Sequence, residues 1–190
     1  LMAVHRPRLF IVEAGNSFGL FSDYAERYGL TVNRVSLEPS SNIALPLFSE
    51  AHRLLEMDVD LEVQDDDDNE DEGEEQRDLL AEMELTARLM ITGGEAKEDE
   101  KMSRAYRSAI RQAILLAAEK TSQETPPRQV LTGDVKAALE ELSRRQDIRP
   151  ERASRLADMA EAMDIFCTGV NGRFFNREGE IWPEADITLV

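Results

Sequence analysis

The chain has 190 residues, 42% of them hydrophobic, and a formal net charge of −17. This length and apolar content predict one sizeable core, or a small α/β layer with a helical subdomain. A nucleic-acid backbone is bound by surfaces rich in Lys and Arg, and this chain is strongly acidic. Direct nucleic-acid binding is therefore not expected. Cys167 is the single cysteine, which excludes an internal disulfide. Without a secretory signal or an apolar span, a reducing, cytoplasmic location is expected.

A strand, a helix and a second strand are predicted within residues 1–48. Residues 8–13 form a short apolar run that meets a glycine, which is typical of a buried strand. The helical pattern that follows begins near Ser17, the expected N-cap, and stops at Gly29. Residues 31–37 then supply β-branched side chains for the second strand. Such a βαβ unit predicts a parallel pair with a right-handed crossover.

The pattern becomes helical over residues 49–168 and predicts an all-helical insertion. Apolar stripes that need partners predict a compact antiparallel bundle. Within it, residues 65–75 hold nine acidic residues and no basic one. Because adjacent carboxylates repel, a disordered loop is expected over about 58–75. Helices are expected near residues 50–57, 76–91, 98–120 and 133–145, with one more beginning at Pro150.

Residues 169–190 return to turns and short apolar runs, which predicts a hairpin and a closing strand of the α/β layer. Both ends of the chain are strand-like and have little around them to cover their faces and edges. We therefore expect an internal piece of a longer polypeptide. The predicted fold class is α/β: a partial parallel sheet interrupted by a large all-helical insertion.

Residues 15–19, Gly-Asn-Ser-Phe-Gly, satisfy G-x-S-x-G between a strand and a helix, as a nucleophile elbow does. A serine hydrolase with Ser17 as its nucleophile is therefore one hypothesis. A triad needs a later histidine, and the sequence offers only His52, in the helical region. A tight turn in which a glycine permits close backbone approach accounts for the same residues.

Nucleotide and metal motifs are sparse. No G-x-x-x-x-G-K-[ST] occurs, and the glycines near 92–97 and 132–134 are expected to be helix caps. Residues 65–75 lack the EF-hand layout, so a diffuse counter-ion atmosphere is expected there. Another hypothesis, ranked ahead of the hydrolase, is an interaction module, in which this acidic loop docks a basic partner with salt-sensitive affinity.

Three short motifs occur in a suggestive order. Residues 13–18, Glu-Ala-Gly-Asn-Ser-Phe, end the first strand; residues 45–48, Leu-Pro-Leu-Phe, precede the helical insertion; and residues 172–176, Gly-Arg-Phe-Phe-Asn, precede the closing strand. This order resembles the motor domain of conjugative-transfer ATPases of type IV secretion systems, the TraC-like class. The resemblance implies a RecA-like parallel sheet with a helical insertion.

The resemblance also implies a parent protein that hydrolyses ATP with Mg²⁺. Such a parent forms a hexamer at the cytoplasmic mouth of a DNA-transfer channel, peripheral to the membrane through other channel components. By this alignment the P-loop lies before Leu1 and the Walker B strand beyond Val190, so this chain is expected not to hydrolyse ATP. Glu13, Asn16 and Ser17 fall on a family motif at the edge of the nucleotide cleft, so the resemblance implies that they are cofactor-binding residues. The family commonly has Asp in place of Glu13.

Overall fold

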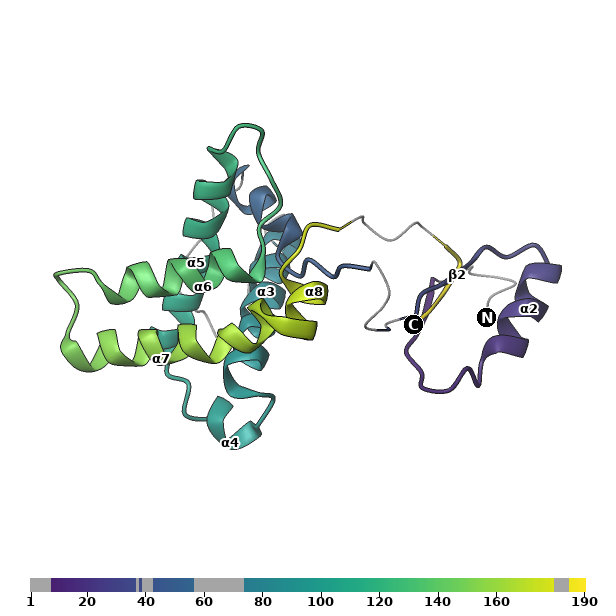
Figure 1. The fold of residues 1–190 in the computed structure, drawn as a ribbon, viewed down its shortest axis with the longest axis horizontal. Helices are drawn as coiled ribbons and strands as arrows, with labels where there is room; N and C mark the ends of the chain where they lie inside the picture. The colour runs from purple at the N-terminus through teal and green to yellow at the C-terminus, as the bar shows by residue number, and fades with distance from the viewer. Residues whose placement is uncertain (1–7, 37, 39–42, 57–73, 180–184) are drawn as a thin grey trace. The chain divides into compact units, whose positions relative to one another are not determined.

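The computed structural model describes residues 8–36, 38, 43–56, 74–179 and 185–190. The chain divides into two compact units (Figure 1). The α/β unit comprises Leu1–Ile43 and Glu180–Val190, and the helical unit comprises Ala44–Gly179. Helices make up most of the described residues, beside one small parallel sheet.

The sheet of the α/β unit has three parallel strands in the order β1-β3-β2. Thr188 of β3 lies opposite Phe10 of β1 and Asn33 of β2. The predicted parallel direction is confirmed, but the expectation that the first two strands pair directly is wrong. All three residues of β3 are buried, as expected of a strand with a neighbour on each side. The elements of this unit are β1 (Leu9–Ile11), α2 (Gly19–Arg27), β2 (Val32–Arg34) and β3 (Ile187–Leu189).

Polar side chains tie β2 to its neighbours in the α/β unit. Arg34 pairs with Asp23 and Glu26 of α2, at 2.7 Å each. The hydrogen bond from Arg34 to Glu26 lowers the pKa of the Glu26 carboxyl. On the other side, the Asp186 carboxylate accepts from the backbone N–H and the hydroxyl of Thr31, at 2.7 and 2.8 Å. These contacts hold the helix on one side of the strand and the start of β3 on the other.

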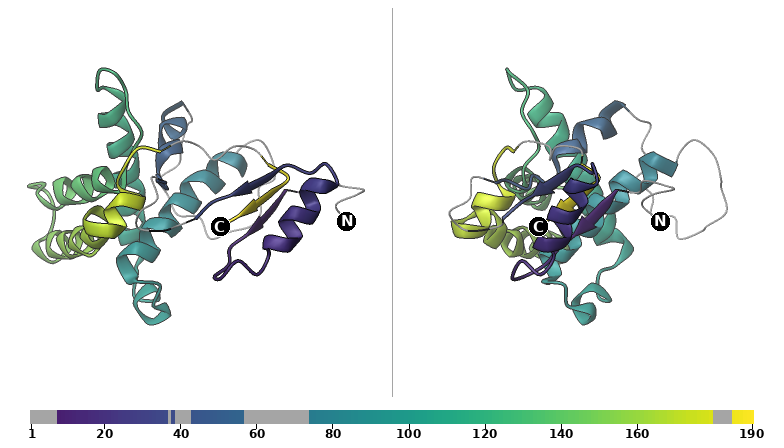
Figure 2. Two further views of the ribbon diagram at one scale, coloured as in Figure 1. Left: turned by 45° about the vertical axis from the view of Figure 1, so that its right-hand side comes forward. Right: turned by 90° about the vertical axis from the view of Figure 1, so that its right-hand side faces the viewer.

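The helical unit is built around one apolar core. α7 packs on α6, α6 on α5, and α5 on both α3 and η1. The left view of Figure 2 shows α6 and α7 side by side. Ile110, Leu139 and Met163 are among the fully buried side chains that fill this core. The elements are η1 (Ser49–Glu56), α3 (Glu74–Thr92), α4 (Ala96–Asp99), α5 (Arg104–Ser122), α6 (Thr132–Ser143), α7 (Pro150–Cys167) and α8 (Gly169–Phe175).

Two expectations for the helical region need correction. The helix expected over 98–120 is divided into α4 and α5, because the extended backbone at Ser103 separates them. The hairpin expected at residues 172–176 lies in and after α8, a helix that packs on α7. Gly169 allows this second helix to start directly after α7, because it adopts a φ of +59° that other residues rarely take. Most of the loop expected over 58–75 lies outside the described residues.

The two ends of the helical unit are held beside each other. The Leu45 N–H donates to the Phe174 carbonyl oxygen at 2.6 Å. Gly179 lies so close to Ala44 that a Cβ on this glycine would stand 2.8 Å from the alanine Cβ. Adjacent ends are what an insertion needs, because the chain then enters and leaves the unit at one place.

Within the described ranges, no helix combines the length and the apolar character that crossing a bilayer requires.

Candidate functional site

The turn formed by residues 13–18 lies at the carboxyl edge of the parallel sheet. The Glu13 N–H donates to the Val190 carbonyl oxygen at 2.8 Å, which continues the pairing of β1 with β3. Beside it, Val35 donates to the Leu189 carbonyl oxygen at 2.8 Å. The carboxyl ends of all three strands therefore meet at one edge, the place where open parallel sheets bind ligands.

The Glu13 carboxylate holds the turn. It accepts hydrogen bonds from the backbone N–H of Ser17 at 2.5 Å and of Phe18 at 3.1 Å. These two donors precede α2, so the carboxylate occupies the place that a helix N-terminus offers to an anion. The expectation that Ser17 caps the helix is wrong: the N-cap is Phe18, which makes no side-chain cap, and Ser17 contributes its backbone instead.

The backbone of the turn explains its sequence. Gly15 has a φ of +100°, which favours glycine, and Asn16 has a φ of +58°, which asparagine tolerates better than most residues. The Asn16 side chain then folds over Gly19, where an added Cβ would lie 2.6 Å from the Asn16 Oδ1. Position 19 therefore requires glycine as long as the Asn16 side chain occupies this place.

The fit of a phosphate to this turn is poor. A phosphate cradle presents free backbone N–H groups, but those of Ser17 and Phe18 are already bonded to Glu13. The carboxylate would also repel a second anion placed against it. In the part of the chain that the structure describes, no group of three or more His, Cys, Asp or Glu side chains is placed to hold a metal ion. The turn is thus a corner at the edge of the sheet that is held by the Glu13 carboxylate.

The described residues of the α/β unit include no histidine that could serve Ser17 as the base of a triad. His52 belongs to the helical unit, where its Nε2 lies 2.7 Å from the Thr121 hydroxyl oxygen. The Thr121 hydroxyl donates to the Ala117 carbonyl oxygen, so it accepts from the imidazole. The structure accounts for His52 as a half-buried side chain that is hydrogen-bonded to Thr121, and the serine hydrolase stays a hypothesis without a structural observation in its favour.

Several large apolar side chains of the α/β unit are exposed. Val12 is 73% exposed and Leu20 85% exposed, and both aromatic rings of the Tyr24–Tyr28 pair are exposed. On α2 the buried residues are Ser22 and Ala25. Exposed apolar clusters mark contact surfaces. The helical spacing of these residues in the sequence is typical of a buried face, and the tertiary structure instead leaves them uncovered in this unit.

A buried charge cluster in the helical unit has no local sequence signature. Glu84 of α3 is 3% exposed and pairs with Arg111 of α5 at 2.5 Å. Arg88 and Arg107 lie 3.6 and 4.0 Å from the same carboxylate. Its partners come from one turn of the same helix and from a second helix, so they meet only after the helices pack. The cluster is a structural contact between α3 and α5.

The structure thus defines a small parallel α/β unit into which a helical unit is inserted between the second and third strands. Comparisons with protein-family models, with curated proteins and with solved structures found no match to this chain.

Proposed function

We propose that this chain is part of the motor domain of a conjugative-transfer ATPase of a type IV secretion system, with a RecA-like sheet, and that it lacks the catalytic nucleotide site. The observation that carries the proposal is the place of β3. This strand follows the whole helical unit, yet it lies parallel between β1 and β2. A helical unit inserted into a parallel sheet is the arrangement that the resemblance implies.

The exposed apolar side chains of the α/β unit also support the proposal. Val12 on the strand side and Leu20, Tyr24 and Tyr28 on the helix side are exposed. In the proposed parent, other parts of the same ATPase cover these side chains. We expect this surface to be buried, and the homo-oligomer to form, in the full-length parent protein.

In this proposal the turn of residues 13–18 shapes the edge of the nucleotide cleft. Glu13 fixes the turn through its two hydrogen bonds, and Asn16 holds the bend over Gly19. ATP with Mg²⁺ supplies the phosphoryl-transfer chemistry in the parent, and its lysine and acidic ligands belong to other segments. Glu13, Asn16 and Ser17 are positioning residues here.

The experiment compares this chain with a longer polypeptide from the same reading frame, extended on both sides. We expect ATP turnover in the longer protein and background turnover in the 190-residue chain. In the longer protein, Glu13→Gln should lower kcat because it loosens the turn, whereas Glu161→Gln, on an exposed position of α7, should not. ATP turnover by the chain alone, or an extended protein without a P-loop, overturns the proposal.

The interaction module is the second candidate. The helical unit has its own core and adjacent ends, as an independent binding module needs. Deleting residues 65–75 separates the two candidates. A module that docks a basic partner through this run loses partner binding, whereas a motor segment keeps its fold and its oligomeric contacts.

A further inference from the structure

A cleft crosses one corner of the helical unit. It lies between the start of α5, the turn that joins α6 to α7, and the first turns of α7. Two adjoining cavities of about 530 and about 190 Å³ form it, and both are lined by Asp147, Ile148 and Arg152. Cavities of this combined size accommodate a peptide segment or a drug-sized molecule rather than a single ion.

Three arginines line this cleft: Arg145, Arg149 and Arg152. Within the described ranges, none of them forms an ion pair or a side-chain hydrogen bond to another residue. The Nε of Arg152 is buried and has no hydrogen-bond partner there. A buried donor without a partner carries a desolvation cost that a bound acceptor removes. Among the described residues, these guanidinium groups of the cleft therefore have no carboxylate partner.

The apolar floor of the cleft and its two carboxylates limit which anionic ligands it can bind. Ile148, Leu156 and Tyr106 contribute apolar surface. Asp147 and Glu151 alternate with the arginines, so the cleft has only a small excess of positive charge. A nucleic-acid backbone, with a charge on every phosphate, would meet these two carboxylates. A peptide that alternates carboxylates with short apolar side chains avoids this repulsion, because its neutral positions can face Asp147 and Glu151.

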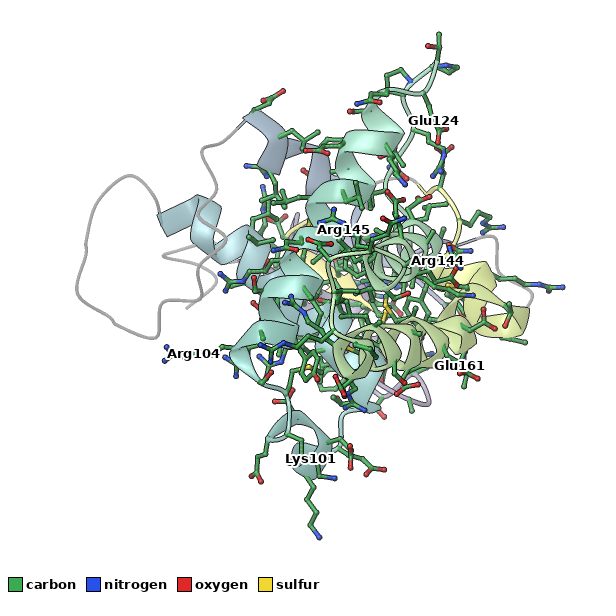
Figure 3. All side chains as sticks on the ribbon, turned by 90° about the vertical axis from the view of Figure 1, so that its left-hand side faces the viewer. Lys101, Arg104, Glu124, Arg144, Arg145 and Glu161 are labelled. Atoms are coloured by element: carbon green, nitrogen blue, oxygen red, sulfur yellow. The ribbon has the colours of Figure 1, made fainter. Side chains whose placement is uncertain are left out.

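We propose that this cleft binds an acidic peptide segment of a partner protein. Carboxylates of the peptide pair with Arg145, Arg149 and Arg152, since the guanidinium fork matches a carboxylate. The short apolar side chains of the peptide rest on Ile148. Figure 3 views the molecule from the side of the α6–α7 turn and labels Arg145 next to Arg144. This inference does not depend on the proposed function. The partner of the cleft is acidic, whereas the partner expected for the acidic run is basic.

The test uses the full chain and a fluorescein-labelled peptide in which glutamates alternate with alanines. Fluorescence anisotropy measures its Kd, and the same peptide with glutamines is the control probe. Arg152→Gln and the double variant Arg145→Gln/Arg149→Gln should each weaken binding by roughly tenfold or more. Arg144→Gln is the matched control, because Arg144 is exposed, pairs with Glu140 at 2.9 Å and lines neither cavity. Urea unfolding midpoints of all variants establish that they fold.

The expected result is binding of the glutamate peptide that weakens with salt and is lost in folded cleft variants. Four results overturn the inference: absence of binding to the unaltered chain, equal binding of the glutamine peptide, equal weakening by Arg144→Gln, and tighter binding of a single-stranded DNA oligonucleotide that competes for the cleft. The last result assigns the cleft to nucleic acid.

Discussion

The side-chain amide of Gln129 bonds to both backbone polar groups of Gly179: its Nε2 donates to the glycine carbonyl oxygen, and its Oε1 accepts from the glycine N–H, each at 3.1 Å. Fifty positions separate the two residues in the chain. Gln129 lies in the loop between α5 and α6, and Gly179 is the last residue of the helical unit. One side chain thus links the last residue of this unit to the α5–α6 loop.

Replacing Gln129 by Ala should release that end. The loss of two hydrogen bonds from a half-buried site should lower the free energy of unfolding by about 1–3 kcal/mol. Urea unfolding followed by circular dichroism measures this change, and faster hydrogen exchange of the Gly179 amide locates it. Gln123→Ala, at the exposed C-cap of α5, is the control and should be nearly neutral. An unchanged hydrogen-exchange rate at the Gly179 amide would show that the Gln129 side chain does not stabilise this end of the unit.

Replacing Glu84 by Gln should be more costly. The carboxylate is buried, and its removal leaves Arg88, Arg107 and Arg111 facing a neutral group. Breaking a buried ion pair on one side typically costs about 3–5 kcal/mol. Glu82→Gln, on an exposed position of the same helix, should shift the unfolding free energy by less than about 0.5 kcal/mol. Similar midpoints for the two variants in urea would refute the structural role of the cluster.

Glu13 and Ser17 should respond differently to truncation. Glu13→Ala removes the acceptor of two backbone N–H groups, so it should cost about 0.5–2 kcal/mol, as the loss of a helix cap does. Ser17→Ala keeps the N–H that bonds to Glu13, so it should be nearly neutral. Hydrogen exchange at the Ser17 and Phe18 amides reads the turn directly. A larger loss for Ser17→Ala than for Glu13→Ala would restore the serine as the cap.

The Cys167 thiol should ionise late. Its half-buried position raises its pKa, and the charge of Lys136 lowers it by a smaller amount. Alkylation by iodoacetamide should therefore need a higher pH in the folded chain than in urea, and Lys136→Met should move the profile higher still. Because the folded state holds the thiol proton more tightly, the stability that this group contributes is present below the unfolded pKa and falls as pH rises through the folded pKa. Coincident folded and unfolded profiles would contradict this.

Local patterns predicted much of the helical unit. The helix expected over 133–145 is α6, and the one expected to begin at Pro150 is α7, with proline in its first turn. These predictions succeed because apolar spacing and helix-start residues act within one element. The division between α4 and α5 was not predicted, because the apolar spacing continues across the extended residue Ser103.

The candidate site was predicted in place but not in detail. The turn of residues 13–18 follows β1, as its glycine and the apolar run before it indicate. Its capping was assigned to the hydroxyl of Ser17, since serine is a common N-cap, while the carboxylate of Glu13 reaches the same donors from the strand end. Which acceptor wins depends on the path of the bend, and that path requires the positive φ values of Gly15 and Asn16.

By itself the sequence determined the properties that act over a few residues: an acidic chain, two strand-like ends, a strand-to-helix turn and a series of amphipathic helices. Only the tertiary structure decided which strand stands between the other two, that α8 joins the helical unit, and that Glu84 meets arginines from a second helix. The physical reason is that hydrogen bonding across a sheet and burial of charge depend on partners far along the chain. Those partners meet only when the chain has folded.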